Sequence, residues 1–116
     1  MAKQLAFWKY EDGMYLDNRE VFNTACLEGR AVTGLAKLPL QDILLKVKKV
    51  FREYERFDDY TYGGLEGNFK IHAQAQAVMF DCSLRMSDEE LGKIIDLMKG
   101  FGCPYYDPQT DTRYDK

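Results

Sequence analysis

The stretch PLQDILLKVKKVFREYERF, residues 39–57, decides how the rest of the sequence is interpreted. Its apolar residues recur every three or four positions, the spacing of one face of an α-helix, and charged or amide side chains fill the other face. Pro39 marks the start, because a first helical residue needs no partner for its N–H. The pattern predicts a helix lying on a core. Its apolar stripe consists of Leu40, Ile43, Leu44, Val47, Val50, Phe51 and Tyr54.

Two further helices are predicted from capping signals. Asp17 stands three residues before Glu20, the spacing of a capping box, and favours a short helix over residues 18–28. Ser87 and Glu90 repeat this spacing. The apolar stripe that follows them predicts a second well-defined helix, which ends near a glycine suited to a left-handed residue. That stripe and its terminating glycine are Leu91, Ile94, Ile95, Met98, Phe101 and Gly102.

A hairpin is predicted at the start of the chain. Residues 5–10 alternate imperfectly between two sets of side chains, as a strand does. Asp12 and Gly13 follow, and an Asp-Gly pair readily supplies the positive φ of a tight turn. Residues 14–16 are therefore predicted to return as a short antiparallel partner. Residues 31–36 form either a further strand or an extended connector.

Residues 69–82 show a change of phase in the apolar pattern. The alternating set that begins at Phe69 gives way, one residue out of step, to the set that includes Val78. No glycine, proline or Asn-Gly pair separates the two halves. We interpret the segment as one long strand with a β-bulge near Gln76 and Ala77. The alternative is two strands joined by an atypical turn.

Two segments lack a regular pattern. Residues 58–68 contain three glycines and two tyrosines and are predicted to be the largest loop. Residues 103–116 contain Pro104 and Pro108 and are predicted to form an extended tail rich in Pro, Tyr and Asp. Together the elements predict one α+β domain over residues 1–116. Its sheet is expected to be mainly antiparallel with three to four strands, and about three helices are expected to pack on one face.

Charge and hydropathy exclude several classes of function. The net charge is −3 and the pI is about 5.2, so the chain lacks the basic footprint of a protein that binds nucleic acid or an anionic membrane. A protein with a basic surface is the natural electrostatic match. No apolar run reaches the roughly 18–20 residues of a membrane span, and the first residues lack the apolar core of a signal peptide. These features predict a cytoplasmic protein, either a monomer or a small oligomer.

No cofactor or metal is predicted. The three cysteines, Cys26, Cys82 and Cys103, form no CxxC pair and no zinc-binding spacing, so we interpret them as reduced thiols. The glycines of residues 63–67 match neither a dinucleotide-binding fingerprint nor a P-loop.

Tyr and Asp are interleaved in two segments, YERFDDYTY at 54–62 and PYYDPQTDTRYD at 104–115. Tyr supplies contact area at a small loss of side-chain entropy, and Asp complements a basic partner. The alternative is that these rings fold back onto the sheet. We predict partner contacts at Asp58, Asp59, Tyr60, Tyr62, Tyr105, Tyr106 and Asp107.

Three functional hypotheses follow. A small acidic domain with such surfaces suits a stoichiometric inhibitor or an immunity-type neutraliser of a basic protein, with toxin-immunity proteins and phage-encoded inhibitors as a class analogy. The alternative is a small enzyme in which His72, the one histidine, activates the thiol of Cys82 or Cys103. The third hypothesis is a structural subunit of a larger assembly.

Overall fold

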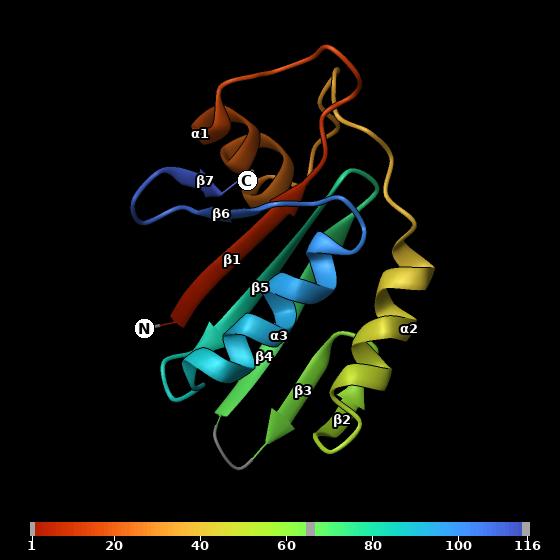
Figure 1. Ribbon diagram of the computed structural model, residues 1–116, viewed down its shortest axis with the longest axis vertical. Helices are drawn as coiled ribbons and strands as arrows, with labels where there is room; N and C mark the ends of the chain where they lie inside the picture. The colour runs from red at the N-terminus through yellow and green to blue at the C-terminus, as the bar shows by residue number, and fades with distance from the viewer. Residues whose placement is uncertain (1, 65–66, 115–116) are drawn as a thin grey trace.

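Two strands, β4 (Gly67–Gln74) and β5 (Ala77–Ser83), lie at the middle of a sheet in this computed structural model, which describes residues 2–64 and 67–114. Strand β5 pairs with β4 on one side and with β1 (Ala2–Trp8) on the other, antiparallel in both cases. The described residues form a seven-stranded antiparallel sheet in the order β2-β3-β4-β5-β1-β6-β7 (Figure 1). The outer strands are β2 (Glu55–Asp58), β3 (Thr61–Gly64), β6 (Tyr105–Asp107) and β7 (Thr112–Tyr114).

The α+β class is as predicted, but three to four strands were too few. Of the four unpredicted strands, β3 comes from the predicted loop, β6 and β7 come from the predicted tail, and β2 comes mostly from the end of the helix predicted over residues 39–57. Pro104 and Pro108 stand just outside β6, where proline removes no hydrogen bond from the ladder, so the prolines border a strand instead of preventing one. Residues 65–66 of the predicted loop and 115–116 of the predicted tail lie outside the described residues.

The bulge prediction for residues 69–82 is wrong, because β4 and β5 are two strands joined by a two-residue turn. Gln74 pairs with Ala77 across this turn. A two-residue reversal puts odd-numbered residues of β4 and even-numbered residues of β5 on one face, which accounts for the shift of phase. Side-chain hydrogen bonds replace the usual turn residues. Gln74 Oε1 accepts from the N–H of Gln76 at 2.7 Å, and Gln76 Oε1 accepts from the N–H of Val32 at 2.8 Å.

The predicted N-terminal hairpin is also wrong, although its turn forms. The N–H of Met14 donates to the carbonyl of Glu11 at 2.9 Å, yet residues 14–16 are not a strand. β5 pairs with β1 along its whole length on one edge, and β6 pairs with Ala6 and Phe7 on the other, so β6 occupies the place of a returning strand beside the end of β1. Residues 31–36 are a connector with a turn at residues 33–34, and they bond to the residues just beyond β1, through the bridge of Leu35 with Tyr10 and the 2.7 Å bond from the N–H of Ala36 to the carbonyl of Lys9.

The helices cover both faces of the sheet and not the single face predicted (Figure 1). On one face lie α2 (Leu40–Val50) and α3 (Asp88–Lys99), over Leu5 and Phe7 of β1. On the other lie α1 (Asn18–Val21) and the π-helical segment η1 (Phe22–Leu27), over Ala6 and Trp8. These four side chains of β1 are all fully buried, and they alternate between the two faces. The strand therefore requires cover on both faces of the sheet.

The helix starts agree with the capping signals. Asp17 Oδ1 accepts from the N–H of Glu20 at 3.1 Å, and Ser87 Oγ accepts from the N–H of Glu90 at 3.2 Å. The helix predicted over residues 39–57 ends earlier, at Val50. The chain then turns, and the residues that follow reach the edge of the sheet as β2.

Candidate functional site

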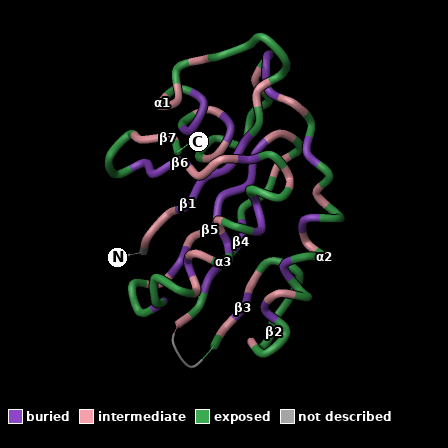
Figure 2. The backbone as a smooth tube through the Cα atoms, viewed as in Figure 1, coloured by how far each residue is buried: buried purple, intermediate pink, exposed green. Residues whose placement is uncertain are grey.

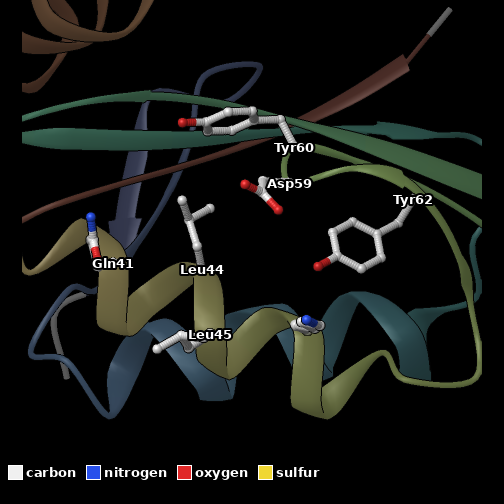
Figure 3. A pocket seen from close by; sticks show the side chains of 7 residues that line it. Gln41, Leu44, Leu45, Asp59, Tyr60 and Tyr62 are labelled. Atoms are coloured by element: carbon white, nitrogen blue, oxygen red, sulfur yellow. The ribbon is translucent and has the colours of Figure 1, made fainter.

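A hollow of about 280 Å³ opens between α2 and the turn that joins β2 to β3 (Figure 3). Figure 3 shows the Leu44 side chain reaching from α2 toward this turn, and the phenol of Tyr62 pointing from β3 toward α2. The walls of the hollow are therefore formed by α2 on one side and by the turn between β2 and β3 on the other. Its lining residues are Gln41, Leu44, Leu45, Lys48, Asp59, Tyr60 and Tyr62.

The turn is held by its two aspartates. Asp58 Oδ1 accepts from the N–H of Tyr60 at 2.8 Å, a short-range bond typical of aspartate in turns. This hydrogen bond is the main cause that lowers the pKa of the exposed Asp58 carboxyl. Asp59 forms an ion pair with Arg56, whose Nη1 lies 2.5 Å from Oδ1. The two carboxylates thus order the wall of the hollow.

The β2–β3 residues predicted to contact a partner differ in accessibility. Asp58 and Asp59 are exposed, and Tyr60 is 44 % exposed. Tyr62 is only 1 % exposed, because its ring stacks on Phe69 with centroids 5.1 Å apart. Its burial also raises the pKa of its hydroxyl. Tyr62 therefore belongs to the floor of the hollow, which corrects its predicted role as a partner contact.

Two of the predicted contacts in β6 are buried as well. The ring of Tyr106 is fully buried between α1 and the sheet, and its hydroxyl donates to Asp111 Oδ1 at 2.6 Å. Asp107 is 9 % exposed and accepts from the N–H of Gln109 at 2.9 Å. The alternative reading, in which rings fold back onto the sheet, is therefore correct for Tyr106. Both residues support the fold instead of forming a contact surface.

Tyr105 is half-buried on the other face of β6. Its ring stacks on that of Tyr114, with centroids 5.3 Å apart and planes within 9°. The two rings border a second hollow of about 310 Å³ beside α3, which Lys99 also lines. The sheet order puts β2 and β3 at one edge and β6 and β7 at the other, so the two predicted segments form no common surface.

Sequence reasoning missed the contribution of α2. Leu45 lies outside the apolar stripe and is 63 % exposed, and it lines the same hollow as the exposed Tyr60. A large apolar residue on the polar face of a predicted helix is the signal that could have pointed to this surface.

The predicted pairing of His72 with a cysteine is not formed. Phe69 and Ile71 of β4 face the core under α2 and α3, so His72 projects from the opposite face. Cys82 and Cys103 both belong to that core and are fully buried. Burial raises the pKa of the Cys82 thiol to about 12 and that of Cys103 to about 11. Neither thiol is therefore disposed to ionise near neutral pH.

We expect all three cysteines of the native protein to react with iodoacetamide at pH 7.5 more slowly than a free cysteine. Cys26 is included, because burial raises the pKa of its thiol to about 12. Mass spectrometry after timed quenching measures each rate, and the same reaction in urea is the control that must be fast. Rapid native labelling of Cys82 or Cys103 would contradict the expectation and support the enzyme hypothesis.

Within residues 2–64 and 67–114, no group of three or more His, Cys, Asp or Glu side chains is placed to hold a metal ion. No helix in the described part of the chain is long and apolar enough to cross a membrane.

No protein-family model matches the chain, and no curated protein matches its sequence. The fold and the site define an α+β domain with an open hollow beside an outer hairpin of its sheet.

Proposed function

We propose that this protein is a cytoplasmic, stoichiometric inhibitor of the immunity type, which binds a basic protein through the surface around the hollow. The observation that carries the proposal is that exposed Leu45 and Tyr60 line the hollow together with Asp59, in a turn that also exposes Asp58. Protein interfaces combine large apolar anchors with a polar rim in this way.

The turn between β2 and β3 is held in one conformation, which supports a binding role. The bond from the N–H of Tyr60 to Asp58 and the ion pair of Asp59 with Arg56 fix the turn before a partner arrives. A pre-ordered surface loses less conformational entropy on binding, so more of the contact energy appears as affinity.

The hollow has a volume of about 280 Å³, which is enough to hold a large side chain of a partner. A side chain on a partner's protruding segment fits such a shallow space. The net charge of −3 favours a basic partner and a salt-sensitive rate of association.

The proposal is tested by capture, stoichiometry and inhibition. Immobilised protein is expected to retain one basic protein from a lysate of the source cell at equal stoichiometry. Adding one equivalent of the inhibitor is expected to abolish the activity of that purified partner. If no basic protein is retained, or if a retained one keeps its activity, the inhibitor proposal is wrong.

The hollow is tested with two variants of its rim. Leu45→Ala and Tyr60→Ala are each expected to weaken binding of the purified partner by about 1 kcal/mol or more, roughly fivefold in Kd. Leu84→Ala is the matched control, because Leu84 is as exposed as Leu45 but lies in the connection from β5 to α3. Unchanged affinity in both rim variants would place the partner elsewhere on the molecule.

A further inference from the structure

The second hollow, of about 310 Å³, lies between the end of α3 and the β6–β7 hairpin. Ile95 and Lys99 are four residues apart, so they lie on the same side of α3. Tyr105 and Tyr114 are paired across β6 and β7, which explains why their rings stack with planes within 9°. One wall is therefore a helix face and the other a pair of cross-strand rings. The lining residues are Ile95, Lys99, Pro104, Tyr105 and Tyr114.

The connection from α3 to β6 fixes these walls relative to each other. The N–H of Gly102 donates to the carbonyl of Lys99 at 2.9 Å, and the φ of Gly102 is 79°, a left-handed conformation that lets the chain leave the helix abruptly. Cys103 is fully buried and anchors the connection in the core. Figure 2 shows that the exposed residues of the β6–β7 hairpin are those at its tip, 109–111, whereas β6 is partly or fully buried. The second hollow thus has its shape before a ligand binds, which reduces the entropy lost on binding.

The charge at the second hollow is positive. Of the described residues that line it, Lys99 alone is charged. Its side chain is exposed, and within residues 2–64 and 67–114 it forms no ion pair, not even with Asp96 one turn earlier. A second cation, Lys9, lies against Gly102 in the connection from α3 to β6.

No acidic side chain in the described part of the chain lines the second hollow. Asp107, two residues after Tyr105, is only 9 % exposed and accepts a backbone hydrogen bond. Burial is the main cause that raises the pKa of the Tyr105 hydroxyl, so this phenol is neutral at physiological pH. Asp115, the next residue after Tyr114, lies outside the described residues. The described surroundings of Lys99 therefore favour an anionic ligand.

The tyrosine rings and the lysine select different parts of one ligand. Aromatic rings prefer offset stacking or edge-to-face contact with another ring. Tyrosine rings also attract cations, but Lys99 in the same hollow repels a cation. The volume of about 310 Å³ is enough to hold one ring with a short acidic chain.

We propose that the second hollow binds a small aromatic carboxylate, with the ligand ring against Tyr105, Tyr114 and Pro104 and the carboxylate beside the ammonium of Lys99. This site goes beyond the proposed inhibitory function, because it lies at the opposite edge of the sheet from β2 and β3 and takes a small molecule (Figure 1).

Titration with matched probes tests the site. Isotopically labelled protein is titrated with 3-phenylpropionate, with its neutral amide 3-phenylpropanamide, and with the aliphatic carboxylate hexanoate, and backbone amide shifts are followed by NMR. The largest shifts with 3-phenylpropionate are expected in residues 95–105 and 112–114. Its Kd is expected to be lower than that of either other probe by about threefold or more, because each of those lacks one of the two interactions.

Variants of the walls separate the charge from the rings. Lys99→Gln is expected to raise the Kd of 3-phenylpropionate by about threefold or more and to leave that of the amide unchanged. Tyr114→Ala, at a residue that is 50 % exposed, is expected to raise both. Lys46→Gln is the matched control, because Lys46 is an exposed lysine of α2 that does not line the second hollow. Asp115→Asn is expected to bind 3-phenylpropionate at least as tightly as the parent.

The proposal is overturned if no shifts occur at millimolar 3-phenylpropionate, if the shifts centre on other residues, or if either matched probe binds as tightly. It is also overturned if Lys99→Gln leaves the Kd of 3-phenylpropionate unchanged, if Lys46→Gln raises it as much, or if Asp115→Asn weakens binding. None of these outcomes bears on inhibition, which the capture experiment tests separately.

Discussion

Replacing Tyr106 with alanine is expected to lower the free energy of unfolding by about 3–5 kcal/mol, the range for removing a buried aromatic ring. The Tyr106 ring is fully buried, with its centroid 5.0 Å from that of Trp8 and 5.7 Å from that of Phe22. Alanine would leave a cavity between β6, β1 and η1, which come from distant parts of the chain. Urea denaturation followed by the fluorescence of Trp8, the one tryptophan, measures the change.

Tyr106→Phe is the control that separates the ring from the hydroxyl. Phenylalanine keeps the packing but loses the 2.6 Å hydrogen bond to Asp111 Oδ1, so we expect a loss of about 1 kcal/mol. If Tyr106→Ala costs no more than Tyr106→Phe, the ring does not contribute to the core as described.

The position of Tyr106 also shows where sequence reasoning fails. Adjacent residues of a strand face opposite sides of a sheet, so Tyr105 and Tyr106 cannot both face a partner once β6 is a strand. Which of the two is buried depends on the pairing of β6 with β1, about a hundred residues earlier in the chain. No local pattern in PYYDP contains that information. A loss of partner binding in Tyr106→Ala would therefore report damage to the fold.

Short sequence signals were sufficient to predict the features that depend only on neighbouring residues, such as the starts of the helices. The capping residues Asp17 and Ser87 and the apolar stripe of α2 correctly located three helix starts. Each of these depends on residues within about one turn of the helix start.

Long-range contacts decided the parts that were predicted wrongly or missed. The turn between β4 and β5 depends on Gln76, whose Nε2 donates to the carbonyls of Val32 at 2.9 Å and Leu35 at 3.1 Å. A connector more than forty residues away thus stabilises a turn that lacks glycine and asparagine. The hollow likewise requires Leu45 of α2 to lie near Tyr60, which only the packed structure reveals.

Replacing Phe69 with alanine is expected to lower the free energy of unfolding by an amount near the upper end of the range of about 3–5 kcal/mol that is typical of buried Phe→Ala changes. Phe69 is 2 % exposed and lies in the core beneath α2 and α3. Alanine removes all of its ring contacts at once and takes away the ring on which Tyr62, the floor of the hollow, is stacked. Ring centroids lie between 4.9 and 5.8 Å from that of Phe69 for Phe51, Tyr54, Tyr62 and Phe80.

Phe69→Leu is the milder variant, with an expected cost of about 1–2 kcal/mol because most of the volume is kept. Leu84→Ala, on the surface, should stay within about 0.5 kcal/mol of the parent. Phe69 and Tyr106 belong to core clusters on opposite faces of the sheet, with no ring contact between them. The losses in a Phe69→Leu/Tyr106→Phe double variant should therefore add to within about 0.5 kcal/mol. A larger coupling energy would mean that strain passes between the two cores through β1 and β5, the strands that both cores share.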